Sequence, residues 1–463
     1  MFARPGELAN AEKTCGRCHT RHVQAVRNSR MHTGAGIVSK TRQRLEPQQA
    51  HEDPASFQTL GHSLADSLLR KLCASCHLGQ DSNRQIDAVQ RRGGGCLACH
   101  LENTESGHAR ISARVSDANC FGCHSRSGRI SLNYAGLAEV DDSNLAEHST
   151  GHARLSDGRL VHKQSADVHH QAGMSCIDCH TGSGLMNLEQ HNGGVDIACN
   201  DCHANRQARL TPQTWPAQYR SMLKRIPFEV PADSVFLQTQ NGTPLWHIEV
   251  RDGQPLLHPK LGGQEIPIPQ LAEQHIPLPG EHQRLNCDSC HATWAPLCLG
   301  CHMQYDKNRP QWDHQSQAVM PGHWREQRWD LDAGAPVLGL LDQHRIGVFI
   351  PGMIMSLDHP SLGETKFLRN FAAISPHTTG AARSCEACHA SAWVLGLGGG
   401  RLTQGPEGMV FEPEQTSLPD GLPADAWTNL DSKNAAETSN YPRPFNRQEI
   451  EKIVRALTSA KIP

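Results

Sequence analysis

All 18 cysteines of this 463-residue chain fall into nine copies of one short pattern, C-x-x-C-H, and none is left over. The cysteine pairs are Cys15 and Cys18, Cys73 and Cys76, Cys96 and Cys99, Cys120 and Cys123, Cys176 and Cys179, Cys199 and Cys202, Cys287 and Cys290, Cys298 and Cys301, and Cys385 and Cys388. A lone C-x-x-C would also fit a zinc or thiol redox site. However, neither such a site nor a disulfide framework needs a histidine after every second cysteine. C-x-x-C-H is the attachment signature of c-type haem, whose porphyrin is bonded to both cysteines while the histidine binds the iron. The sequence therefore predicts nine covalent haem c cofactors, at motifs one to nine in chain order.

The histidine that ends each motif is the expected proximal ligand of one iron. These nine residues are His19, His77, His100, His124, His180, His203, His291, His302 and His389. The chain has 29 histidines, so enough remain to give every iron a second imidazole. The candidates for that distal position are His32, His62, His108, His152, His170, His191, His282, His314 and His377. Each of them could also be a surface histidine or a propionate partner, and His148 and His169 compete with His152 and His170.

Two of these candidates share a sequence repeat. SGHARIS at 106–112 and TGHARLS at 150–156 each place a Gly-His pair downstream of a motif, at His108 and His152. The alternative is that both are incidental histidines at helix starts capped by Ser or Thr. With haem attachment this dense, the repeat favours iron ligation.

Motif spacing divides the chain into three regions. Residues 1–205 carry six motifs, 206–280 are cysteine-free and rich in proline, and 281–463 carry three motifs and an amphipathic tail helix. Asn-Gly and Asp-Gly pairs flanked by alternating apolar residues predict a small β-hairpin insert in the middle region, either a spacer or a docking surface. A second apolar run, at 345–358, is also typical of a hairpin. The predicted fold class is mainly α, with much irregular structure wrapped around the haems and low sheet content.

Charge and hydropathy restrict the partners and the compartment. The formal net charge is −3 before haem propionates are added, and an acidic protein is a poor partner for nucleic acid. No apolar run is long enough for a transmembrane helix. Covalent haem attachment takes place outside the bacterial inner membrane, and the first residues lack an apolar leader segment. We therefore expect a periplasmic or extracellular protein whose leader was removed or lies outside this numbering.

The motif neighbourhoods carry a family resemblance, in HHQAGMSCIDCHTG at 169–182, CLGCHMQYD at 298–306 and PHTTGAARSCEACH at 376–389. The chain resembles the multihaem c-type cytochromes. More loosely, it is similar to the octahaem tetrathionate reductase and hydroxylamine oxidoreductase-like group. It departs from that group by having nine motifs rather than eight, and it has no C-x-x-C-K motif, the lysine-ligated catalytic haem of some multihaem reductases.

Two functions follow from this resemblance. The favoured one is an electron carrier that works between redox partner proteins or an extracellular acceptor, including the case of self-assembly into a cytochrome filament. The alternative is an enzyme that reduces a small sulfur or nitrogen oxyanion at a haem with an open distal position. Tyr305, beside motif eight, is the first proton donor to consider, although it could equally hydrogen-bond a propionate. The carrier is favoured over the enzyme, and no catalytic residue is assigned.

Overall fold

The computed structural model describes residues 3–48, 55–82, 87, 89–103, 109–125, 130–141, 150–188, 196–204, 209–224, 226, 228–271, 278, 280–328, 331–350, 353–370, 372–406, 408–431 and 441–459. These residues form two compact units. The first unit combines residues 1–123, 169–280 and 314–316, and the second combines 124–168, 281–313 and 317–463. Segment 124–168, expected in the N-terminal region, thus packs with the C-terminal half, and the cysteine-free insert packs with motifs five and six.

Seven of the nine motifs are helical. They belong to α2 (Gly16–Arg27), α6 (Cys96–His100), α7 (Ala118–His124), α10 (Cys176–Cys179), α12 (Cys199–His203), α14 (Cys287–His291) and α15 (Cys385–His389). In a helix, residues three apart share a face, so both cysteines of a motif lie on one side. Motif two lies in a 3-10 turn, Ala74–Cys76. Motif eight is extended, because Cys298 ends a strand and Cys301 begins another.

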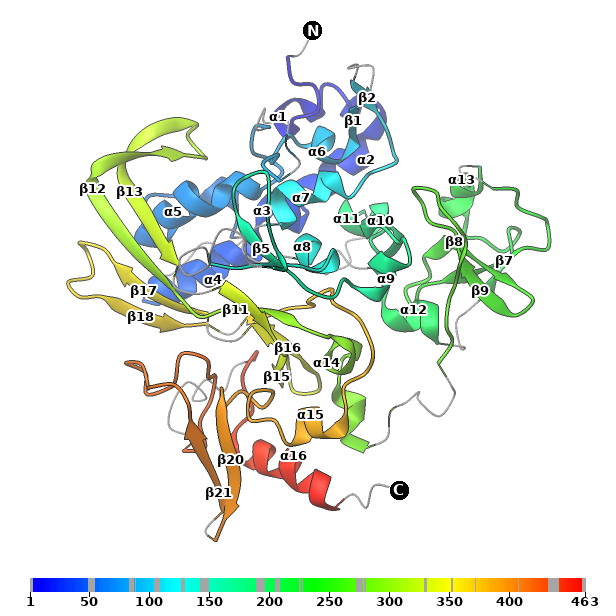
Figure 1. The fold of residues 1–463 in the computed structure, drawn as a ribbon. Helices are drawn as coiled ribbons and strands as arrows, with labels where there is room; N and C mark the ends of the chain where they lie inside the picture. Colours follow the sequence, from blue (N-terminus) through cyan, green and yellow to red (C-terminus); the bar gives the residue numbers. More distant parts are fainter. Residues whose placement is uncertain are drawn as a thin grey trace. The chain divides into compact units, whose positions relative to one another are not determined.

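The first unit begins with helices that pack around motifs one to three (Figure 1). They are α1 (Leu8–Ala11), α3 (Arg30–Thr33), α4 (Ala35–Leu45) and α5 (Leu64–Leu68). A two-stranded sheet of β1 (Leu101–Asn103) and β2 (Ala109–Ile111) follows motif three. Short helices flank motif five, at α9 (Val168–Gln171) and α11 (Gly182–Leu185). Arg42 and Asp66 join α4 to α5 through a buried, bidentate ion pair of 2.7 and 2.9 Å.

The insert is a five-stranded antiparallel sheet in the order β10-β9-β8-β7-β6. Its strands are β6 (Arg209–Leu210), β7 (Val235–Gln238), β8 (Pro244–Arg251), β9 (Gln254–Leu257) and β10 (Ile266–Pro267), and α13 (Arg220–Leu223) precedes β7. The predicted turn at Asp252-Gly253 joins β8 to β9, and both residues have the positive φ that a type I′ turn requires. One face of the sheet packs on Met174 and Ile197, which precede motifs five and six.

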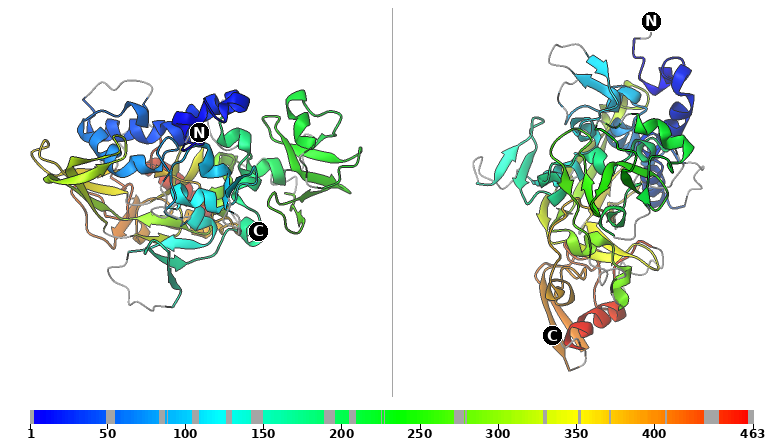
Figure 2. Two further views of the ribbon diagram at one scale, coloured as in Figure 1. Left: turned by 90° about the horizontal axis from the view of Figure 1, so that it is seen from above. Right: turned by 90° about the vertical axis from the view of Figure 1, so that its right-hand side faces the viewer.

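The second unit is mostly β. Its sheets are β3-β5-β4, β11-β14, β13-β12-β17-β18, β15-β16-β19 and β20-β21. The strands are β3 (Leu137–Glu139), β4 (His152–Arg154), β5 (Leu160–Lys163), β11 (Ala295–Cys298), β12 (Cys301–Asp313), β13 (Ala318–Arg328), β14 (Leu331–Gly334), β15 (Val337–Leu340), β16 (Ile346–Ile350), β17 (Ile354–Asp358), β18 (Lys366–Arg369), β19 (Ala372–Ala373), β20 (Gly400–Gly405) and β21 (Gly408–Pro413). Strands β12 and β13 form a long hairpin, which Figure 2 shows from two further directions. The helices outside the motifs are α8 (Ile130–Tyr134) and the expected tail helix, α16 (Arg447–Ser459), whose Ile450 is fully buried.

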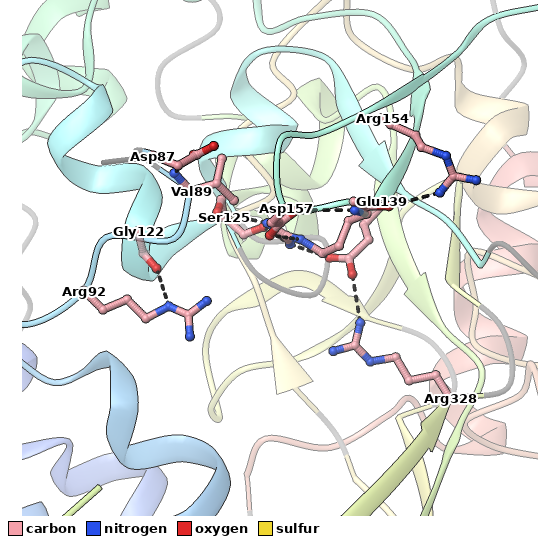
Figure 3. Close-up of polar contacts among 11 residues, drawn as sticks. Asp87, Val89, Arg92, Gly122, Ser125, Glu139, Arg154, Asp157 and Arg328 are labelled. Atoms are coloured by element: carbon pink, nitrogen blue, oxygen red, sulfur yellow. Dashed lines mark hydrogen bonds and ion pairs between the residues drawn. The ribbon is translucent and has the colours of Figure 1, made fainter. Parts of the chain in front are cut away.

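A buried carboxylate joins two segments of the second unit. Glu139 on β3 accepts hydrogen bonds from Arg159 at 2.9 Å and from Arg328 on β13 at 2.8 Å (Figure 3). Arg159 also donates to the carbonyl of Ser125, directly after motif four. Arg328 is paired in register with Cys301 of motif eight. The network therefore connects the backbone beside motifs four and eight.

The predicted fold class is wrong. The structure has 29% helix and 27% strand, and its described residues form seven sheets, so it is neither mainly α nor poor in sheet. Most motif helices span only four to seven residues, whereas many linking segments form strands, and some of these pair with strands that are not their neighbours in the chain, as β12 does with β17. The run at 345–358 illustrates this: β16 and β17 form, but they join different sheets instead of pairing with each other.

In the second copy of the Gly-His repeat, His152 begins a strand, β4, rather than a helix, and in the first copy Ala109–Ile111 forms β2, while Gly107 and His108 lie outside the described residues. No helix among the described residues is long and apolar enough to cross a membrane.

Candidate functional site

Five of the histidines that end the motifs make a hydrogen bond through Nδ1. His100, His203, His291 and His389 donate Nδ1–H to backbone carbonyls of Ser112 (2.9 Å), Pro269 (2.8 Å), Gly380 (3.0 Å) and Ile453 (2.6 Å), and His302 lies 2.8 Å from the Ser356 hydroxyl. A neutral imidazole that donates through Nδ1 has an unprotonated Nε2, which is the form that binds a metal. His77 differs, because its Nδ1 accepts from the N–H of Gly79 at 3.0 Å.

Three of these histidines face a second imidazole from another segment. The ring centres are 6.2 Å apart for His32 and His77, 6.0 Å for His169 and His203, and 5.9 Å for His282 and His389. Two imidazoles that bind opposite sides of one iron at ~2 Å place their ring centres roughly 6 Å apart. The three pairs therefore have the separation that a haem iron between them requires.

The distal candidates have different surroundings. His32 and His282 face motif-ending histidines, whereas His170 is exposed and its neighbour His169 takes the place opposite His203. His62 is exposed. His108, His191 and the alternative His148 lie outside the described residues.

The remaining distal candidates are His152, His314 and His377. His152 stacks on His162 with centres 4.7 Å apart and rings nearly parallel, which is too close for an iron between them. His314 hydrogen-bonds the carbonyl of Arg70 through its backbone. The pKa of His77 is lowered to about 4, first by burial and then by the charges of His32 and His314. His377 donates Nδ1–H to the carbonyl of Ser375 and lies near Asp288 of motif seven.

Cysteines of different motifs meet in pairs. Side-chain hydrogen bonds join Cys15 to Cys96, Cys76 to Cys123, and Cys120 to Cys176, and the thiols interact electrostatically between Cys99 and Cys120, Cys179 and Cys202, and Cys290 and Cys388. Burial, followed by the neighbouring thiol, raises the pKa of Cys96 to about 11. The Cys96 thiol is therefore not a reactive thiolate of the kind that a thiol redox enzyme uses, whereas the hydrogen bond to Cys176 lowers the pKa of Cys120. The contacts place motif one beside three, two beside four, four beside three and five, five beside six, and seven beside nine.

Comparison with known proteins adds no relative. No protein-family model, curated protein or solved structure matches this chain.

Motif eight has a different environment. His302 Nε2 lies 3.2 Å from the Asp358 carboxylate, on the neighbouring strand β17. Tyr305 packs on Trp324 and His359, with ring centres 4.9 and 4.5 Å away. It borders a cavity of about 380 Å³, whose lining also contains Gln304, Asp358, His359, Pro360, Gly363, Glu364 and Thr365. Two carboxylates at this cavity disfavour an anionic ligand.

The insert sheet is bound to motifs five and six through two equivalent aspartates. In C-I-D-C-H, Asp178 Oδ2 accepts from the N–H of Ser175 at 2.7 Å and Oδ1 accepts from the N–H of Lys260 at 2.8 Å. In C-N-D-C-H, Asp201 accepts in the same way from Ala198 and Gln240, at 2.7 and 2.9 Å. Each carboxylate caps its own motif helix with one oxygen and binds the insert with the other, so the insert is part of this site. The signal in the sequence was an aspartate at the same position of both motifs.

His247 makes this contact pH-dependent. It is buried on β8, and its Nε2–H donates to the carbonyl of Asp178 at 2.9 Å. Burial lowers the pKa of His247 well below 6.5, so the unfolded chain binds a proton that the folded chain does not. Stability is therefore retained above pH 6.5 and lost as pH falls below it, by up to about 1.4 kcal/mol per pH unit.

Unfolding midpoints between pH 7.5 and 5.5 test this expectation. His247→Gln, which keeps a donor for Asp178, should flatten the pH dependence, whereas His344→Gln at an exposed site should keep it. Equal slopes in all three proteins would show that His247 does not titrate on unfolding.

Proposed function

We propose that this chain is a multihaem c-type cytochrome that carries electrons along nine covalently attached haems in the periplasm or outside the cell. The observation that supports it most is the C-x-x-C-H pattern, which occurs nine times and uses all 18 cysteines. The residues also fit the cofactor, because the Nδ1 hydrogen bonds of His100, His203, His291 and His389 leave Nε2 unprotonated, the form that binds iron, and three imidazole pairs have the required separation. Among the described residues, no group of three or more His, Cys, Asp or Glu could hold a bare metal ion, whereas a haem iron needs only two protein ligands.

Each part of the chain has a separate role in this proposal. The paired cysteines anchor the porphyrin, the motif histidine binds one side of the iron, and a histidine from a distant segment binds the other. When bound, the haem supplies one-electron oxidation and reduction at an iron whose potential depends on ligands, burial and nearby charge. The cysteine contacts predict a route through the first unit that differs from chain order: motif one meets three, three meets four, four meets five, and five meets six, with two joining at four.

The reductase is the second candidate, and the motif-eight cavity is where it would act. Tyr305 and His359 could donate protons there, but Asp358 and Glu364 border the same cavity and oppose the binding of a sulfur or nitrogen oxyanion. An electron carrier needs no substrate pocket. Its partners would be redox proteins, an extracellular acceptor or further copies of itself.

Mass spectrometry of protein exported together with a haem-attachment system tests the cofactor. We expect the mass of the chain plus nine haems, and eight after the double change Cys385→Ala and Cys388→Ala. The control is the double change Ser384→Ala and Ser391→Ala beside the same motif, which should leave nine haems attached. Eighteen cysteines free for alkylation, or disulfides such as Cys76–Cys123, would contradict haem attachment.

Electron paramagnetic resonance of the oxidised protein separates the two functions. The carrier predicts low-spin ferric haems that bind neither nitrite nor sulfite. A high-spin haem in stoichiometric amount that binds either anion would favour the reductase instead.

A further inference from the structure

Lys260 lies where the insert meets motif five. It follows β9, and its backbone N–H donates to Asp178 at 2.8 Å. Its Nζ donates to the carbonyl of Ile177 and lies 5.7 Å from the centre of the Trp246 ring. Ile177 and Asp178 are the two residues between the attachment cysteines of motif five. Both the backbone and the side chain of Lys260 thus bind the segment between Cys176 and Cys179.

The same ammonium is close to two haem-attachment sites. It interacts electrostatically with the sulfur positions of Cys179 in motif five and Cys202 in motif six, and with the carboxylates of Asp178 and Asp196. Burial lowers the pKa of Lys260 to about 8, so it is mostly protonated at pH 7. Because the site is partly removed from solvent, a charge there is screened less than one on the surface.

We propose that Lys260 raises the reduction potential of the haems attached at motifs five and six. The inference rests on the proposed function and assigns the insert an electrostatic role beyond support. Reduction of either ferric iron takes one electron from the donor and lowers the charge of the site by one, while Lys260 keeps its proton. A fixed positive charge nearby favours the reduced form, because that form carries the extra negative charge.

The position of Lys260 beside motifs five and six affects the proposed path of electrons through the first unit. Motif six ends the series of contacts in the first unit, since motif five meets both four and six. Raising the potential at five and six would draw electrons from motifs one to four toward that end. The insert therefore biases the direction of transfer within the first unit.

Spectroelectrochemical titration of the full-length holoprotein with dithionite and ferricyanide tests the proposal. Lys260→Met and Lys260→Gln should each move the part of the curve belonging to one or two haems to lower potential. We expect about a tenfold change in the reduction equilibrium, which equals about 59 mV for one electron. Glutamine keeps a donor for Ile177, so agreement between the two variants assigns the shift to charge.

Two control variants separate an effect of charge from an effect of packing. Lys260→Arg, which keeps the charge, and Lys40→Met, at an exposed helical site, should both titrate like the unchanged protein. A shift in the arginine variant as large as in the neutral variants would assign it to packing and overturn the proposal. So would superimposable curves for all variants with nine haems bound. A preparation without covalent haem would instead refute the proposed function, so the two failures are distinguishable.

Discussion

His282→Ala is expected to convert one of the nine haems to a high-spin form. His282 lies opposite His389 of motif nine, with ring centres 5.9 Å apart. Removing one imidazole leaves an iron with an open position, which binds small ligands that a six-coordinate iron excludes. Electron paramagnetic resonance should show a high-spin ferric signal equal to one haem, and the reduced protein should bind one equivalent of carbon monoxide.

An exposed histidine of the same unit provides the control. His344→Ala should keep the low-spin spectrum and bind no carbon monoxide. His389 should still hold its haem in the His282 variant, because its Nδ1 hydrogen bond to Ile453 is independent of His282. If the His282 variant remained fully low-spin, a different residue would be the distal ligand of motif nine.

Asp66→Asn is expected to lower the free energy of unfolding by about 3–5 kcal/mol, because it leaves the Arg42 guanidinium buried without its counter-charge. Both side chains of this pair are only 6% exposed. Asp66 also accepts from the N–H of Gly61 at 2.6 Å, so the loop before α5 loses a partner as well. Guanidinium unfolding followed by circular dichroism should show a clearly lower midpoint for the variant.

A surface ion pair is the matched comparison. Glu412→Gln removes the partner of Arg401, and these side chains are 60% and 73% exposed. Exposed pairs contribute about 0–1 kcal/mol, so this midpoint should hardly change. Equal midpoints for the two variants would show that the Arg42–Asp66 pair contributes no more than a surface pair.

The distal ligands show where prediction from sequence reached its limit. His169 and His170 are adjacent in HHQAGMSC, and position alone did not separate them. The backbone of α9 directs neighbouring side chains about 100° apart, so only one of the two can face His203. Which one does depends on how α9 packs against α12, a contact between segments more than thirty residues apart. The surroundings of His152 were set in the same way, since its strand is paired with β5 and brings it against His162.

Patterns confined to a few residues determined much of this protein. The nine C-x-x-C-H motifs are visible in the sequence alone, and the role of their histidines as proximal ligands stays a prediction. The turn at Asp252-Gly253 and the buried face of the tail helix around Ile450 follow from local backbone preference and periodicity. Tertiary structure alone decided the sheet content, the separate sheets of β16 and β17, the pairing of imidazoles and the binding of the insert to Asp178 and Asp201. The physical reason is the sequence separation of the interacting residues. A helical turn or a tight turn is stabilised by contacts within a few residues. Strand pairing, in contrast, requires partners that only the folded chain brings together.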